Sequence, residues 1–224
     1  NIEELSKSVN ELKSAPFDMV EWRADFFNDI EDPQKRFQAM SFLREQLGNT
    51  PILFTARTSV EGGKLDIDTE GHVKLLTSVI DTGLMDLVDV ELSRGEDAMK
   101  TIRDAAHKAG MHIIGSLHDF ASTPSKERIV YHLCQMQKLG ADIVKYAVTP
   151  QCARDVLTLL DATLTMQEEH NETPVITMSM GGQGAVSRVC GSVFGSSITF
   201  GTAGNSSAPG QLPADLLSTF INNL

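Results

Sequence analysis

The sequence predicts an α/β protein with a parallel β-sheet, and among such folds it favours a (β/α)8 barrel. Short apolar runs start roughly 23–35 residues apart along the 224-residue chain, about the length of one strand–helix unit. Most runs are apolar throughout rather than alternating, as expected for parallel strands covered on both faces. Helical patterns fill most of the gaps, and such regular alternation indicates either an open doubly wound sheet or a closed barrel.

The individual elements follow from these patterns in order. The chain opens with NIEELSKSVNELKSA, which predicts a helix capped by Asn1. Glycine follows several later helical patterns, as at Gly48 and Gly140, where helices often end. Nothing in the chain resembles a linker, so we expect residues 1–224 to form a single domain. The predicted strands are 17–23, 51–57, 86–92, 112–118, 142–148, 174–180 and 197–202, and the later helices are 33–47, 69–82, 96–109, 125–139, 150–169 and 213–223.

A dinucleotide-binding fingerprint would favour the open sheet, and its best match is Gly182-x-Gly184 after the strand 174–180. Ser187 takes the place of the last glycine, and no acidic residue ends a strand about 20 residues later, so we favour the closed barrel. Seven strands are one short of a barrel, and the chain opens with a helix. We therefore expect the first strand to lie upstream of Asn1.

Composition narrows the classes of partner. The formal net charge is −11 and the chain has no cluster of lysine and arginine, which argues against nucleic acid and acidic membrane surfaces. No apolar run approaches the roughly 20 residues needed to span a bilayer. The three cysteines form an odd set without C-x-x-C spacing, which argues against a disulfide framework or zinc ribbon and favours a reducing cytoplasm. A small anionic substrate would need its own arginines.

Polar and methionine side chains gather near the carboxyl ends of the predicted strands, where barrel enzymes carry their chemistry. Each has an ordinary structural explanation by itself: Glu21 and Arg23 as an ion pair, a lone histidine as a satisfied group, methionines as core. Structural roles do not predict that so many should converge on one end of a barrel. The candidates are Glu21, Arg23, Arg57, Glu61, Glu91, His118, Lys145, Met178, Met180, Arg188, Ser207 and Gln211, with Arg188 and Ser207 expected in loops.

Lys145 is the hardest of these to explain structurally. It lies in the middle of ADIVKYAVTP, where a charged amine must be paired, lose its proton or reach solvent. A neutral amine attacks a ketone or aldehyde to give an iminium, which accepts electrons when the adjacent proton is removed. His118, one strand away, is the natural base for that proton, and arginines suit a carboxylate or phosphate. The pattern therefore predicts Schiff-base chemistry at Lys145.

Six segments together resemble type I 3-dehydroquinate dehydratase, an enzyme family of the shikimate pathway. They are EWRAD, FTARTSVEGG, GSLHDF, ADIVKYAVTP, SMGGQGAVSR and GTAGNSSAPGQ, and they follow in order from about residue 17 to the end. The resemblance implies a (β/α)8 barrel, often dimeric, that uses no cofactor or metal. It also implies syn dehydration of 3-dehydroquinate to 3-dehydroshikimate through a lysine Schiff base.

The resemblance assigns roles to the matching positions of this chain. Lys145 would be the Schiff-base lysine, His118 the general acid and base, and Glu61 the residue that orients His118. Arg188 would hold the substrate carboxylate. The other substrate-binding positions would be Glu21, Arg23 and Arg57 for the ring hydroxyls, Met178 and Met180 as walls of the ring, and Ser207 and Gln211 in a lid.

Two alternatives remain open at this point. A class I aldolase of the same barrel type also needs a strand lysine, but predicts C–C cleavage, usually of phosphorylated substrates, with a phosphate site after the last two strands. The second alternative, from a different class, is a catalytically inactive binding or regulatory barrel. The intact set of lysine, histidine, glutamate and arginine argues against inactivity.

Overall fold

The computed structural model describes residues 1–204 and 208–224. The chain divides into two compact units, Asn1–Ile114 (unit 1) and Gly115–Leu224 (unit 2). Unit 1 contains, in order, α1 (Ile2–Leu12), β1 (Val20–Arg23), the 3₁₀ helix η1 (Ala24–Phe26), α2 (Pro33–Leu47), β2 (Ile52–Thr55), η2 (Ser59–Glu61), α3 (Thr69–Ile80), β3 (Leu87–Glu91), η3 (Leu92–Arg94), α4 (Glu96–Lys108) and the start of β4 (His112–Asp119). Unit 2 contains the rest of β4, then α5 (Lys126–Lys138), β5 (Ile143–Val148), α6 (Ala153–Glu169), β6 (Val175–Ser179), α7 (Gly181–Cys190), η4 (Gly191–Phe194) and α8 (Ala214–Ile221).

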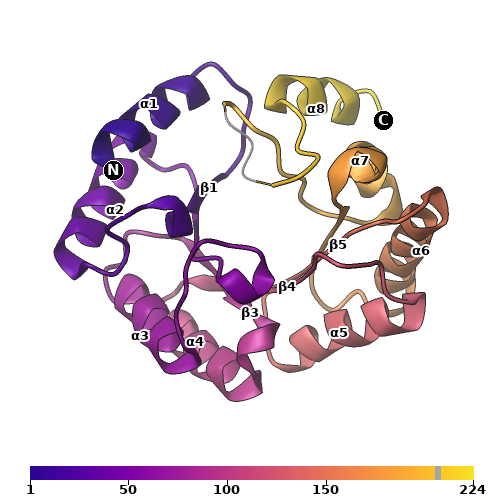
Figure 1. Cartoon of the computed structure of the whole chain (residues 1–224), viewed down its shortest axis with the longest axis horizontal. Helices are drawn as coiled ribbons and strands as arrows, with labels where there is room; N and C mark the ends of the chain where they lie inside the picture. The colour runs from indigo at the N-terminus through magenta and orange to yellow at the C-terminus, as the bar shows by residue number, and fades with distance from the viewer. Residues whose placement is uncertain (205–207) are drawn as a thin grey trace. The chain divides into compact units, whose positions relative to one another are not determined.

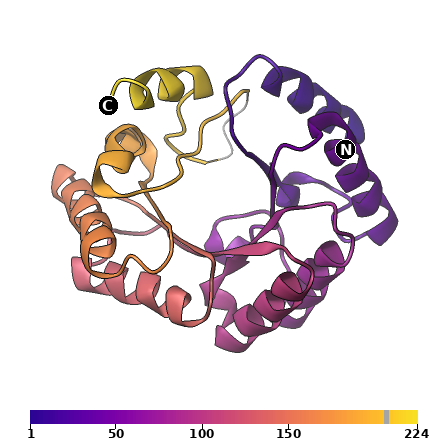
Figure 2. The same cartoon turned by 180° about the vertical axis from the view of Figure 1, so that it is seen from behind.

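The strands lie in the sheet in sequence order, β1 to β6. β1 pairs with β2, β2 with β3, and β5 with β6, each pair in parallel. Parallel neighbours need a crossover between them, and the helices supply it. In unit 1, α2, α3 and α4 lie on the outer side of the strands (Figure 1), and the rear view shows α5 and α6 side by side in unit 2 (Figure 2). This confirms the predicted α/β class.

Local sequence signals explain where the helices begin and end. Asn1 caps α1, as the sequence predicts, and forms a capping box with Glu4. Asp32 caps α2, with a proline at its first position, and Gly48 ends that helix with a positive φ of 57°. Within the described residues, none of the helices is both long and apolar enough to cross a membrane.

Each unit has apolar packing of its own. In unit 1, the Trp22 ring meets the rings of Phe27 and Phe54 edge-on, at centroid distances of 5.9 and 5.4 Å. In unit 2, α5 buries Ile129 and Leu133, which are four residues apart and therefore share a helix face. Packed helices leave the strand ends as the places where polar side chains are tolerated.

Two predictions about the last third of the chain are wrong. Residues 197–202 form no strand: Ser196 bridges Val175 and Thr202 bridges Pro213 only as isolated pairs. A Cβ at Gly201 would lie 2.9 Å from the Ala214 Cα, so this segment turns onto the start of α8 instead of continuing a ladder.

The segment GGQGAVSR, predicted to be a loop, forms the helix α7. Gly184 serves close packing, since a Cβ there would lie 2.1 Å from the Ser179 carbonyl oxygen. The Ser187 hydroxyl completes the contact by accepting from the Ser179 N–H at 2.9 Å. Arg188 therefore lies on a helix rather than in a loop.

Candidate active site

Lys145 is buried in the middle of β5, as predicted, with 4% of its surface exposed. Its strand neighbours Val144 and Tyr146 are also buried, and its Cα is paired with Ile176 of β6. The Nζ atom lies 4.5 Å from the centroid of the Phe200 ring, a cation–π distance for a charged amine. Phe200 was not among the predicted site residues, because its segment had the pattern of an ordinary strand.

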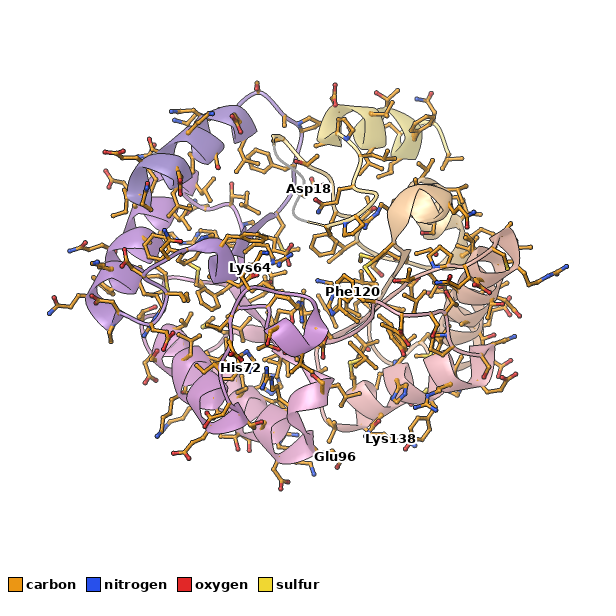
Figure 3. The ribbon with its side chains drawn as sticks, in the orientation of Figure 1. Asp18, Lys64, His72, Glu96, Phe120 and Lys138 are labelled. Carbon is orange, nitrogen blue, oxygen red and sulfur yellow. The ribbon has the colours of Figure 1, made fainter. Side chains whose placement is uncertain are left out.

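His118 is the seventh residue of β4, the neighbour of β5 in the sheet. Its ring stacks on that of Phe120, labelled in Figure 3, with centroids 6.4 Å apart. Asp119 caps the following turn by accepting from the backbone N–H groups of Ala121 and Ser122 at 2.9 and 2.8 Å. Thr149, just beyond β5, donates to the Asp119 carbonyl at 3.0 Å. The ends of the strands that carry histidine and lysine are therefore tied together.

Arg188 and Met178 come together in unit 2. The Nη1 atom of Arg188 lies 3.6 Å from the Met178 sulfur, and only 3% of the surface of Arg188 is exposed. Met178 belongs to β6, and Met180 follows as the residue that precedes α7; both are buried. Because Arg188 is almost two turns into α7, the helix brings its side chain back to the strand end.

The described part of the loop before α8 lies against the start of α7. The Pro209 carbonyl accepts from the Gly181 N–H at 3.2 Å and from the Arg188 guanidinium at 3.4 Å. Gly210 is required here, because a Cβ would lie 2.4 Å from the Gly181 carbonyl oxygen. Gln211 accepts from the backbone N–H of Ala208 at 3.2 Å. Ser207, the other residue predicted for this loop, lies outside the described residues.

Unit 1 contains a buried cluster of charge around Arg57, two residues beyond β2. The Nη2 atom is 2.9 Å from the Asp89 carboxylate, and Nη1 is 3.0 Å from Glu91 and 3.4 Å from Glu61. Asp89 and Glu91 are two apart on β3, so they share one face of that strand. A pair of acids at this spacing in an apolar run is the sequence signal for such a cluster, and of the two only Glu91 is among the predicted site residues.

Glu61 reaches Arg57 because the chain turns tightly after η2. Gly62 ends that 3₁₀ helix in the left-handed region, with φ 77°. A Cβ at Gly63 would lie 2.0 Å from the Arg57 carbonyl oxygen, so only glycine fits. The Ser93 hydroxyl donates to the Glu61 carboxyl at 2.5 Å. These contacts explain the Glu-Gly-Gly motif.

The cluster changes how its members hold protons. Burial alone would lower the pKa of Arg57, but the surrounding carboxylates, Asp89 foremost, outweigh it and raise that pKa. Burial raises the pKa of Glu61 to about 8, against the opposing effect of Arg57. Glu61 is therefore largely protonated at neutral pH, whereas Arg57 stays charged.

Thr58 and Arg94 hold the third carboxylate of the cluster. Glu91 accepts from the Thr58 N–H at 2.8 Å and its hydroxyl at 2.5 Å, and the Arg94 Nε lies 3.4 Å away. His72 of α3, labelled in Figure 3, is fully buried nearby in the same unit, and burial lowers its pKa. Sequence reasoning missed Thr58 and Arg94, because nothing local marks them as partners of Glu91.

Glu21 and Arg23 each have a partner that the sequence did not indicate. Glu21 accepts from the Thr55 hydroxyl on the neighbouring strand β2 at 2.8 Å. Arg23 forms an ion pair with Asp25, with Nε 2.7 Å from the carboxylate. The two residues therefore have different surroundings on β1: Glu21 is hydrogen-bonded across the sheet, and Arg23, at the strand end, is paired along the chain.

Parallel strands that carry a buried lysine, a histidine and arginines at or near their carboxyl ends are typical of α/β barrel enzymes. The sequence model of the family described as type I 3-dehydroquinase matches residues 1–224. The chain belongs to this family.

Individual relatives agree with that assignment. The chain is 47% identical to the 3-dehydroquinate dehydratase of Syntrophotalea carbinolica, over 98% of this chain and 88% of the relative, and 44% identical to that of Clostridioides difficile, over 100% and 88%. The crystal structure of the type I 3-dehydroquinate dehydratase from Clostridium difficile with covalently modified comenic acid covers 100% of this chain and 87% of its own, with TM-score 0.95 and 44% identity. This likeness confirms the predicted barrel class.

Proposed function

We propose that this chain dehydrates 3-dehydroquinate to 3-dehydroshikimate through a Schiff base on Lys145. The observation that carries the proposal is a buried lysine in the middle of β5, in a chain that belongs to the type I 3-dehydroquinase family. Burial of an amine is unfavourable, so a lysine in that position indicates a role that outweighs its cost in stability. Family membership favours this hydro-lyase reaction over the aldolase alternative and the inactive barrel.

The reaction proceeds in four stages. The Lys145 amine condenses with the C3 ketone, losing water to form an iminium, while His118 assists the proton transfers. His118 then removes a proton from C2, and the electrons move into the iminium to give an enamine. The enamine expels the C1 hydroxyl, which His118 protonates as it leaves. Water finally hydrolyses the iminium and frees the product and Lys145.

The binding roles follow the chemistry of each side chain. Arg188 holds the substrate carboxylate, and its contact with Met178 supports this, because the carboxylate and one wall of the ring then meet at one place. Met180 adds to that wall, and Gln211 closes the loop over the ring together with Ser207. Glu61 orients His118, and the ring hydroxyls are held by Glu21, Arg23 and Arg57.

We further propose that residues 1–224 work as one catalytic domain, in a cytoplasmic homodimer, on a small anionic substrate. The acidic net charge of −11 makes local arginines essential for such a substrate, and Arg57 and Arg188 are each 3% exposed and oriented by contacts. The three thiols are free, in keeping with a reducing compartment.

The test combines turnover with chemical trapping. The purified chain is mixed with 3-dehydroquinate, and the conjugated enone carboxylate is followed by its ultraviolet absorbance. Borohydride is then added during turnover, and mass spectrometry locates the reduced adduct. We expect product, and a single adduct on the peptide that contains Lys145. Absence of turnover, or trapping only with phosphorylated aldol substrates, would refute the proposal in favour of the aldolase.

A further inference from the structure

Asp25 contacts two segments of unit 1 that are far apart in sequence. It lies in η1, immediately after β1, and its side chain is fully shielded from solvent. One carboxylate oxygen accepts from the Arg23 Nε at 2.7 Å, and the other accepts from Arg23 Nη2 at 2.8 Å. The second oxygen also accepts from the backbone N–H of Lys64 at 3.1 Å. The carboxylate thus joins an arginine at a strand end to the loop that follows Glu61.

The guanidinium of Arg23 is restrained on a second side as well. Its central carbon lies 4.9 Å from the centroid of the Phe26 ring, within the range of a cation–π contact. The Arg23 side chain keeps 16% of its surface exposed, in contrast to Asp25. A bidentate pair and a ring face together leave this side chain few orientations.

The loop that anchors Asp25 is itself fixed. The Gly63 N–H donates to the Thr58 carbonyl at 2.8 Å, and the Leu65 N–H donates to the Arg57 carbonyl at 3.3 Å. Lys64, labelled in Figure 3, lies between these two bonded residues. The N–H of Lys64 therefore has a fixed position. Its hydrogen bond holds the Asp25 carboxylate in place, and the carboxylate in turn orients Arg23.

We infer that Asp25 is a positioning residue that fixes the Arg23 guanidinium before the substrate arrives, using the loop after Glu61 as its anchor. The inference rests on the proposed function, in which Arg23 holds a ring hydroxyl. A guanidinium that is already oriented loses little side-chain entropy on binding, so the benefit appears as substrate affinity. Because only the C1 hydroxyl is expelled, an interaction with a hydroxyl that stays on the ring persists through the reaction and affects KM rather than kcat.

The test is Asp25→Asn. The asparagine keeps one acceptor oxygen for the Lys64 N–H, but its NH2 group cannot accept from the guanidinium. We expect KM for 3-dehydroquinate to rise about tenfold or more while kcat stays within about twofold, since hydrogen bonds to charged groups are among the stronger ones. The matched control is Asp29→Asn, which breaks an exposed ion pair with Lys35 in the same region and should leave both constants unchanged.

A double-mutant cycle separates positioning from general support of the fold. Arg23→Met should raise KM by itself, and adding Asp25→Asn to it should raise KM no further, because Asp25 acts only through Arg23. An unchanged KM in Asp25→Asn beside a raised KM in Arg23→Met overturns the inference alone. An unchanged KM in Arg23→Met overturns it together with the proposed role of Arg23, and a wild-type chain without turnover overturns the proposed function itself.

If Asp25→Asn does not fold, the wild-type chain gives an independent measurement. The Arg23 Nε–H resonance is assigned by its loss in Arg23→Lys, and its exchange with solvent is followed by NMR without substrate. We expect slow exchange, because this proton is bonded to a shielded carboxylate. Exchange as fast as that of the exposed arginine side chains would overturn the inference.

Discussion

Arg57 in unit 1 lies within 3.4 Å of three acidic side chains, whereas Lys145 in unit 2 lies against the ring of Phe200, in a strand of buried apolar residues. Unit 1 holds its charged groups by ion pairs whose members come from β3 and from the turns after β2. In unit 2, the amine of Lys145 lies over an aromatic ring and between buried strand neighbours. Removing a charge from unit 1 leaves other buried charges without compensation, so its variants should lose stability. Removing the lysine from unit 2 removes the amine that the proposed reaction needs, so its main effect should be on activity.

Replacement of Lys145 should have the largest effect on activity. Lys145→Ala should abolish both turnover and borohydride trapping, because no iminium can form, while the chain stays folded. The matched control is Lys126→Ala, which removes a lysine paired with Asp161 on the surface of the same unit. Turnover and trapping in that control should be normal. Retention of a trapped adduct in Lys145→Ala would move the Schiff base to another lysine.

Replacement of His118 should leave the first step and stop the later ones. His118→Ala still has the amine, so it should form a covalent adduct slowly, visible by mass spectrometry. Product formation should fall by roughly 10²–10⁴-fold or more, because this is the usual contribution of general acid–base catalysis and one group here serves several steps. His112→Ala, at the exposed start of the same strand, is the control. Normal turnover in His118→Ala would leave Glu21 or Glu91 as the next candidate base.

The contrast in stability is tested by one substitution in each unit. Arg57→Met leaves Asp89 and Glu91 buried without their cation, so it should lower the unfolding free energy by about 3–5 kcal/mol at pH 7. Met178→Leu nearly conserves volume in apolar surroundings and should cost less than about 1.5 kcal/mol. Urea unfolding of both variants measures the difference. Equal losses of unfolding free energy in the two variants would mean that packing, and not charge, stabilises the surroundings of both Arg57 and Met178.

The pH dependence of stability tests the buried charge cluster of unit 1 in a second way. Burial raises the pKa of Glu61 from its ordinary 4.5 to about 8, so between these values the folded chain keeps a proton that the unfolded chain releases. Its contribution to stability is full below pH 4.5 and is lost as the pH rises toward 8, by at most about 1.4 kcal/mol per pH unit.

Glu61→Gln carries no such proton. Its unfolding free energy, relative to that of the wild type, should therefore increase steadily from about pH 5 to pH 8. Glu45→Gln, an exposed position on α2, should leave the slope of the wild type unchanged. A parallel slope in wild type and Glu61→Gln would show that another group takes up the proton.

Prediction from the sequence succeeded where a pattern is local. Apart from 197–202, each predicted strand begins and ends within three residues of the observed one, and Lys145 lies in mid-strand as predicted. It failed at 197–202 and at α7, where close backbone approach decides the structure: Gly201 packs on Ala214, and Gly184 on Ser179. A glycine that permits a close contact has the same letter as a glycine that ends a helix, so the sequence pattern does not separate the two.

The sequence by itself determined the alternation of strands and helices, the family, and which positions carry chemical groups, because these depend on residue type and spacing along the chain. Only the tertiary structure decided which charges meet. Arg57 finds its carboxylates 32 and 34 residues away at Asp89 and Glu91, and Asp25 finds Lys64 39 residues away. Such pairs form when packing of the strands and turns buries the charges together, and a buried charge must then take whichever opposite charge lies within reach.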